Sequence, residues 1–202
     1  MLRSLQDIIR ASVAAGYRVY WSIVTSKDYG SPQSRPRVYV VAVRNDSLKH
    51  EFMWPEPVAL TQGVASLLEI DNMDRKYKQD LCKGARKRLH TAVKHIKQHG
   101  GNPRTEPWCV DVDSSEDFCH WHRDCSPCIT KSRGCHGFYV TSIGGMMSME
   151  EIMKLQGYDP RVLNWKQSGI PRTTWGQAIG DSMSLNVLRP ILLQGCVAAG
   201  LI

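Results

Sequence analysis

The sequence predicts an α/β fold, and two apolar stretches carry this prediction. Residues 38–43 are mostly β-branched, and Tyr39, Val41 and Val43 alternate with their neighbours, which is typical of a buried strand. Near the carboxyl end, residues 183–199 predict a helix built on Met183, Leu185, Val187, Leu188, Ile191, Leu192 and Val197.

The first half of the chain supplies the other elements of an α/β unit. Residues 2–15 carry apolar side chains at roughly helical spacing, and Gly16 is a natural helix stop. Residues 17–24 form the next predicted strand. A loop rich in Gly, Pro and Asp, residues 26–34, leads from it to residues 38–43, so we expect the two strands to pair as a hairpin.

The middle of the chain has weaker signals. Residues 61–70 fit a short helix, and residues 74–99 fit one long basic helix. Residues 104–145 contain few helix signals, so we expect irregular structure with short strands. Ser148 and Glu151 then have the spacing of a capping box, which predicts a helix start.

Composition limits the class of protein. Among 202 residues, 42% are hydrophobic and 22% charged, as in globular proteins. No apolar run approaches the ~20 residues that span a bilayer, so no membrane partner is expected. The amino terminus lacks the apolar core of a signal peptide, and the seven cysteines are an odd number. We therefore expect an intracellular, reducing location, and a nuclear one if the source is eukaryotic.

The positive charge is concentrated in one span. The net charge is +7, and between Arg75 and Arg104 the sole acidic residue is Asp80. A solvated helix face is one explanation of such a run, and contact with DNA phosphates is the other. The candidates for phosphate contact are Lys83, Arg86, Lys87 and Arg88.

Two arginines stand at the entrance to the strand at 38–43. Arg35 and Arg37 end the string Tyr-Gly-Ser-Pro-Gln-Ser-Arg-Pro-Arg, residues 29–37. The plain alternative is a basic turn on a surface hairpin. A guanidinium, however, presents planar donors that suit a phosphate, a carboxylate or a base edge. The string closely resembles the Tyr-Gly-x-Pro-Gln-x-Arg-x-Arg motif of the C5-cytosine DNA methyltransferases.

Two later strings continue the resemblance in the order of that family. Residues 147–158 resemble its Leu-Thr-x-x-Glu-x-x-Arg-Leu-Gln-Gly-Phe segment, and residues 177–187 are similar to its Gln-x-Gly-Asn-Ser/Ala-x-x-x-Asn-Val motif. The resemblance implies the C-terminal part of a Rossmann-like, S-adenosylmethionine-dependent methyltransferase domain with an inserted, largely irregular target-recognition domain. The implied divisions are a partial methyltransferase domain at 1–60, the recognition domain at 61–145 and a return to the methyltransferase domain at 146–202.

Three strings of the family are absent from this sequence: Phe-x-Gly-x-Gly of the cofactor strand, Pro-Cys-Gln of the nucleophile and Glu-Asn-Val of the cytosine-holding Glu. Pro127 and Cys128 stand where the family keeps its recognition region, so Cys128 is not the family's nucleophile by position. We expect a chain that is inactive alone. A truncated gene, a subunit of a split enzyme and a degenerate relative are the open explanations.

The resemblance also implies roles for single residues. Arg37 would help to hold a flipped cytosine, with Gln33 and Arg35 bracing the pocket. Gly180, Asp181 and Ser182 would contact S-adenosyl-L-methionine. Asp181 replaces the usual Asn and offers only acceptors, so it would repel a carboxylate of the cofactor but could accept from an amine or hydroxyl.

The cysteines and histidines at 119–136 allow two interpretations. Cys125 and Cys128 have the spacing of a zinc knuckle, and Cys119, His122 or Cys135 could complete a site. One such pair is weak support, so we assign no metal and expect reduced thiols. The stretch 127–134 also resembles the Pro-Thr-Ile-Thr-x-Ser end of some recognition regions, which makes Thr130, Lys131 and Arg133 candidate DNA contacts.

The sequence therefore predicts the C-terminal portion of a DNA (cytosine-5-)-methyltransferase. It would act on double-stranded DNA with S-adenosyl-L-methionine, together with an N-terminal half that a separate chain could supply. The alternative is a non-catalytic basic DNA-binding module, with or without structural zinc.

Overall fold

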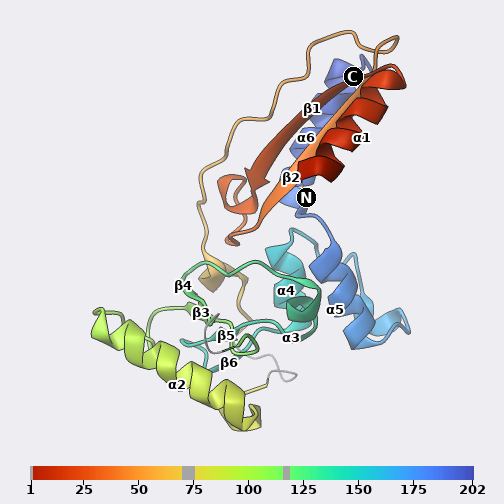
Figure 1. Cartoon of the computed structure of the whole chain (residues 1–202). Helices are drawn as coiled ribbons and strands as arrows, with labels where there is room; N and C mark the ends of the chain where they lie inside the picture. Colours follow the sequence, from red (N-terminus) through yellow and green to blue (C-terminus); the bar gives the residue numbers. More distant parts are fainter. Residues whose placement is uncertain (1, 70–75, 116–118) are drawn as a thin grey trace.

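The computed structural model describes residues 2–69, 76–115 and 119–202 and arranges them in two lobes (Figure 1). The first, which we call the hairpin lobe, contains α1 (Leu2–Ala14), β1 (Tyr17–Thr25), β2 (Pro36–Arg44) and α6 (Leu185–Ala198). The second, which we call the insert lobe, is formed by the chain between β2 and α6. Within the described ranges, no helix combines the length and apolar composition that crossing a membrane requires.

The hairpin lobe has the predicted helix–strand–strand–helix order. β1 and β2 pair antiparallel from Tyr17 opposite Arg44 to the loop end. Tyr39 and Val43 point to α6 and are buried, as the alternation predicts. The expectation of a fully buried strand is wrong, because Val38 and Val40 on the other face are 40% and 38% exposed. Among the described residues this sheet has two strands, and Trp21 and Ile23, which pair with Val40 and Val38, are also exposed.

The insert lobe is built on a small antiparallel sheet in the order β4-β3-β5-β6. Its strands are short, as expected for 104–145: β3 (Trp108–Val110), β4 (Trp121–Arg123), β5 (Tyr139–Val140) and β6 (Gly145–Met146). Helix α2 (Lys83–Gln98) packs its apolar stripe on this sheet, through Ala85, Leu89 and Ala92. Figure 1 shows α2 at the edge of the molecule, with the sheet between it and the hairpin lobe.

Helix α2 is shorter than the predicted helix at 74–99. It begins at Lys83, where the Cys82 sulfur accepts a hydrogen bond from the Ala85 N–H at 3.5 Å. Before it, Tyr77 forms a bridge with Gly145, and residues 78–80 make a 3₁₀ turn. The start of the predicted helix, up to residue 75, lies outside the described residues. The helix expected at 61–70 is a single 3₁₀ turn at Val64–Leu67.

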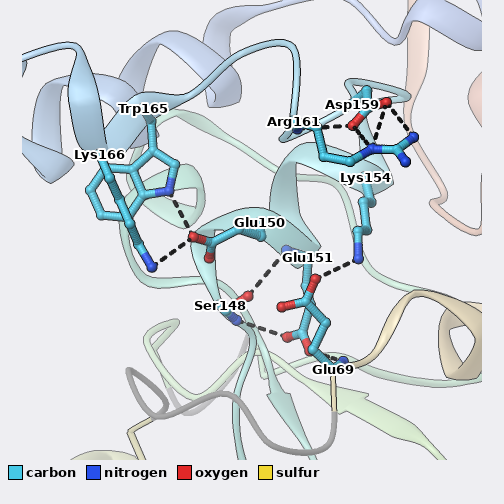
Figure 2. Close-up of polar contacts among 9 residues, drawn as sticks. All are labelled: Glu69, Ser148, Glu150, Glu151, Lys154, Asp159, Arg161, Trp165 and Lys166. Carbon is cyan, nitrogen blue, oxygen red and sulfur yellow. Dashed lines mark hydrogen bonds and ion pairs between the residues drawn. The ribbon is translucent and has the colours of Figure 1, made fainter.

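Helix α4 (Met149–Leu155) has the predicted capping box (Figure 2). The Ser148 hydroxyl accepts from the Glu151 N–H at 3.2 Å, and the Glu151 carboxylate accepts from the Ser148 N–H at 2.8 Å. Glu151 is fully buried, and its other oxygen accepts from the Glu69 N–H at 2.6 Å. A buried carboxylate needs such donors, and a helix N-terminus favours its charge. Glu151 thus fastens the segment at residue 69 to α4.

Two helices were not predicted: α3 (Lys131–His136) and α5 (Arg172–Asp181). Both are poor in apolar residues and contain glycine, so neither shows a clear helical period. Helices α4 and α5 share a core with the insert lobe through Phe138, Ile152 and Ile179. The division at residue 146 stays a prediction. Among the described helices that follow this residue, α6 packs on the hairpin, through Val187 and Ile191.

Candidate functional site

The three motif segments meet through two buried glutamines. Gln33 and Gln156 are both fully buried, and Gln33 Nε2 donates to Gln156 Oε1 at 3.4 Å. Gln33 Oε1 accepts from the Ile129 N–H at 3.3 Å, and Gln156 Nε2 donates to the Ile179 carbonyl at 3.0 Å. A buried amide must pair both its donor and its acceptor, and here each pairing joins a different segment. Residues 29–37, 147–158 and 177–187 therefore form one structure.

Arg35 is a second connection between the first and third motifs. Its side chain donates to the carbonyls of Ile129, Gly180 (3.0 Å) and Ser182 (2.9 Å). The residue is only 4% exposed, and burial, followed by the like charge of Arg37, lowers the pKa of the guanidinium. Such contacts suit the predicted brace.

Arg37 lies beside Arg35 but is only half-buried on β2, where it pairs with Val24 across the hairpin. Its Nη1 donates to the Pro36 carbonyl at 2.8 Å, and its Nη2 contacts the Cys128 sulfur at 3.3 Å. Among the described residues, no carboxylate lies within 4.0 Å of the guanidinium of Arg35 or Arg37. Arg37 is thus a partly exposed cation with donors to spare.

The predicted cofactor segment forms the end of α5. The Gly180 carbonyl is occupied by Arg35, and the Ser182 hydroxyl donates to the Ile179 carbonyl at 2.7 Å. The Asp181 carboxylate is 59% exposed and lies 3.6 Å from Lys131 Nζ. The one outward polar group here is therefore an acceptor, which fits an amine or hydroxyl of S-adenosyl-L-methionine and not its carboxylate.

Three glycines hold α3 against α5. A Cβ on Gly134 would lie 1.8 Å from the Gly176 carbonyl oxygen, and one on Gly180 would lie 2.3 Å from the Thr130 carbonyl oxygen. The two helices therefore touch backbone to backbone. This contact explains why Lys131, from the predicted recognition region, lies beside Asp181 of the predicted cofactor segment.

The predicted DNA contacts divide by position. Thr130 and Lys131 are exposed at the start of α3. Arg133 instead pairs with Asp111 at 2.6 Å, and its side chain is only 16% exposed. Arg88 is also engaged inside the insert lobe, because its Nε donates to the Val112 carbonyl at 2.6 Å. The remaining candidates on the outer face of α2 are exposed: Lys83, Arg86 and Lys87.

The weak metal candidates of the sequence are Cys119, His122, Cys125, Cys128 and Cys135. In the part of the chain that the structure describes, no three His, Cys, Asp or Glu side chains lie close enough to hold a metal ion. Burial raises the pKa of Cys125 and of Cys119, where Asp111 adds to the effect. His122 lies on β4, and burial followed by His120 lowers its pKa. The structure gives this set no common centre.

Sequence reasoning missed two members of the site. The bridging role of Gln156 had a signal, since the residue stands inside the Leu-Gln-Gly string. The contact of Cys128 with Arg37 had none, because 91 residues separate the two in the sequence.

The fold and the joined motifs point to one class of protein, the cytosine C5 methyltransferases. A family-wide sequence profile described as C-5 cytosine-specific DNA methylase matches residues 2–194. The chain belongs to this family, which uses S-adenosyl-L-methionine as methyl donor.

Relatives of known name support the assignment. The Type II methyltransferase M.HaeII of Haemophilus aegyptius is 25% identical over 178 residues, covering 87% of this chain and 50% of the relative. M.NgoBI of Neisseria gonorrhoeae is 24% identical, with 92% and 53% covered. The chain thus spans about half the length of these curated relatives.

Solved structures confirm the Rossmann-like methyltransferase fold class. The S. pombe Dnmt2 methyltransferase matches with a TM-score of 0.57 at 14% identity, covering 96% of this chain and 63% of that one. The Entamoeba histolytica methyltransferase EhMeth matches with a TM-score of 0.56 at 16% identity, covering 96% and 57%.

Proposed function

We propose that this chain supplies the C-terminal portion of a DNA (cytosine-5-)-methyltransferase, which moves a methyl group from S-adenosyl-L-methionine to C5 of a flipped cytosine. The observation that carries the proposal is the buried connection of the three motifs through Gln33, Gln156 and Arg35. A chance set of similar strings would have no reason to meet in one polar network. We place this activity in the cell interior, and in the nucleus if the source is eukaryotic.

In this proposal, Arg37 recognises the extruded base. A base taken out of the duplex must have its polar edge satisfied, and a guanidinium with unused donors supports this. Arg37 is the arginine of the motif that is partly exposed, whereas the donors of Arg35 are spent on backbone carbonyls. Gln33 and Arg35 hold the pocket in shape.

An amino-terminal methyltransferase half would complete the hairpin lobe. A two-stranded sheet is marginal by itself, yet β2 has a free edge here. A groove of about 480 Å³ runs between β2 and α6, lined by apolar residues that include Val41 and Ile191. A second groove of about 790 Å³ follows Leu188 and Leu192 of α6. Apolar grooves of this kind suit further strands and helices of the same domain.

The test is reconstitution. The chain is co-expressed with an amino-terminal half that carries the Phe-x-Gly-x-Gly, Pro-Cys-Gln and Glu-Asn-Val strings, starting with the reading frame directly upstream. We expect tritiated methyl transfer to DNA from the pair and none from either part. Transfer by this chain alone would refute its dependence on a partner. A co-purifying but inactive pair would refute the enzymatic role.

The second candidate function is a non-catalytic DNA-binding module. It is favoured by the position of α2 with its basic face, because the small sheet lies between this helix and the hairpin lobe (Figure 1). If it is correct, the chain binds duplex DNA, and neither that binding nor any methyl transfer changes when an amino-terminal half is added. Duplex affinity and methyl transfer, measured on the same preparations, separate the two candidates.

A further inference from the structure

Cys128 lies against two cationic side chains. Its sulfur is 3.3 Å from Arg37 Nη2 and 3.8 Å from Arg35 Nη1. The thiol is partly exposed, and it lies in the insert lobe just before α3, beside Arg37 of β2. Among the described residues, no other cysteine sulfur accepts a hydrogen bond from a cationic side chain.

Among the described residues, neither Arg35 nor Arg37 has a carboxylate within 4.0 Å. Arg35 is only 4% exposed. Its Nε has no hydrogen-bond partner among the described groups. Burial and the charge of Arg37 both disfavour its cationic form. An anion beside Cys128 therefore stabilises the cluster, because the partly exposed guanidinium of Arg37 has donors left for a charge-assisted contact. A sulfur that becomes anionic and an anionic reagent that approaches it both meet this need.

Five of the other six cysteines can be compared with Cys128 by what surrounds the sulfur. Burial raises the pKa of the thiols of Cys109 and Cys125. Burial and the Asp111 charge do the same for Cys119. Cys135 donates to the Thr173 carbonyl at 3.2 Å. Cys82 is exposed at the start of α2 and accepts from a backbone N–H, which makes it the strictest comparison within the chain.

We propose that Cys128 is a site of covalent modification by anionic small-molecule disulfides, of which glutathione disulfide is the type. The Cys128 thiol loses its proton to solvent, and the sulfur attacks one sulfur of the disulfide. The S–S bond of the reagent breaks, a mixed disulfide forms on Cys128, and one glutathione thiolate leaves. The carboxylates of the bound tripeptide then face the partly exposed Arg37. On the proposed function, the adduct occupies the space where Arg37 would meet a base.

Charge selectivity tests this inference independently of any methyltransferase activity. The purified chain is treated with glutathione disulfide or with cystamine, a cationic disulfide, and each cysteine is followed over time by peptide mass spectrometry. Fragment spectra separate Cys128 from Cys125, which share one tryptic peptide. With glutathione disulfide, we expect Cys128 to react about tenfold faster than Cys82 or Cys135, and the preference to reverse or vanish with cystamine.

Two variants test whether Arg37 causes the charge selectivity of Cys128. Arg37→Gln should remove the preference of Cys128 for the anionic reagent, while its melting temperature shows that it is folded. Arg44→Gln, on the same strand but paired with Asp46 at the surface, is the matched control and should react like the wild type. Equal rates at Cys128 and Cys82, equal rates with the two disulfides, or an unchanged preference in Arg37→Gln would each overturn the proposal.

Discussion

The side chains of Gln33 and Gln156 face one another across 3.4 Å, from Nε2 to Oε1, although 123 residues separate them in the sequence. Neither is exposed, so each amide depends on the other and on nearby backbone groups. This pair is the point at which the loop before β2, the end of α4 and the end of α5 are joined.

The Gln33 amide should therefore matter to folding more than its lack of charge suggests. Gln33→Leu is of similar size but leaves the Ile129 N–H and Gln156 Oε1 without these partners. We expect a loss of about 1–3 kcal/mol of unfolding free energy for each unpaired group. Denaturant unfolding measures it, with Gln6→Leu on the exposed side of α1 as control. A change within 0.5 kcal/mol, about the scatter of surface substitutions, would contradict the network.

Because α3 and α5 touch at their backbones, replacing a glycine with alanine should destabilise the protein at this contact and stabilise it in α6. Gly180→Ala should destabilise by about 1–3 kcal/mol or more, since its methyl group would meet the Thr130 carbonyl oxygen 2.3 Å away. Gly195→Ala in α6 meets nothing closer than Val41 at 4.0 Å and should stabilise by about 0.5–1 kcal/mol through helix propensity. Thermal unfolding of the two variants compares them directly. Equal effects would mean that the helices do not touch at their backbones.

Arg37 and Arg35 should fail in different ways in a reconstituted enzyme. Arg37→Ala should slow methyl transfer by raising its activation free energy by about 1–3 kcal/mol or more, because a contact with the base is lost. Duplex affinity and melting temperature should be nearly unchanged. Arg35→Ala should lower the melting temperature first, because its buried contacts to three carbonyls are lost. Turnover, affinity and melting are measured on the same preparations. Normal turnover in a folded Arg37→Ala protein would remove Arg37 from the pocket.

Duplex binding by the isolated chain should weaken steeply with salt. If Lys83 and Arg86 contact phosphates, replacing either with Gln should reduce the slope of log K against log salt by about 0.9. Arg133→Gln is the informative comparison. Because Arg133 pairs with Asp111, this variant should lose stability while the slope of log K against log salt stays unchanged. Binding that is indifferent to salt, or a slope that both surface variants leave intact, would exclude α2 as a DNA contact.

We expect Glu150 to make a pH-dependent contribution to the stability of the folded protein. Burial by itself would raise the pKa of this carboxyl, but its own backbone N–H, the Trp165 indole and Lys166 hold the pKa below the ordinary 4.5 (Figure 2). As pH falls, the unfolded chain takes up the proton first. The contribution is therefore complete above about pH 4.5 and is lost as pH falls through the lower folded-state pKa.

Glu150→Gln should accordingly lower the Tm at pH 7 by about 2–4 °C, which corresponds to roughly 1 kcal/mol in a chain of this size. The difference from the wild type should shrink below about pH 4.5. Glu56→Gln, at an exposed position, should show no such trend. A difference that is constant over the whole pH range would indicate a packing effect in place of a charge effect.

The sequence predicted the parts of the fold that have a clear period or a local signal. The first helix, the hairpin, the capping box at Ser148 and the final helix are of this kind, because each depends on neighbours along the chain. Helices α3 and α5 are not: they depend on Gly134 and Gly180, whose missing side chains permit a contact across 46 residues. Such a requirement is visible only when the second backbone is in place.

The candidate site divides in the same way. The strings that contain Gln33, Arg35 and Asp181 could be found by their resemblance to a family. Their contacts could not, because Arg35 reaches carbonyl groups, and a carbonyl group has no signature in a sequence. For the same reason, the sequence could not show that Arg88 and Arg133 are engaged inside the protein while the other basic candidates are exposed. Their partners are a backbone carbonyl and a carboxylate that is distant in the sequence.

The insert lobe is bound at Ser126 to the loop between β1 and β2. The Ser126 N–H donates to the Pro32 carbonyl at 2.8 Å, and the Ser126 carbonyl accepts from the Ser34 N–H at 2.9 Å. These are backbone bonds, so they survive a change of side chain on either partner. The chain ahead of Ser126 can therefore exchange its loops and charges without moving Arg37. A backbone anchor of this kind separates variation in the insert lobe from the geometry of the hairpin.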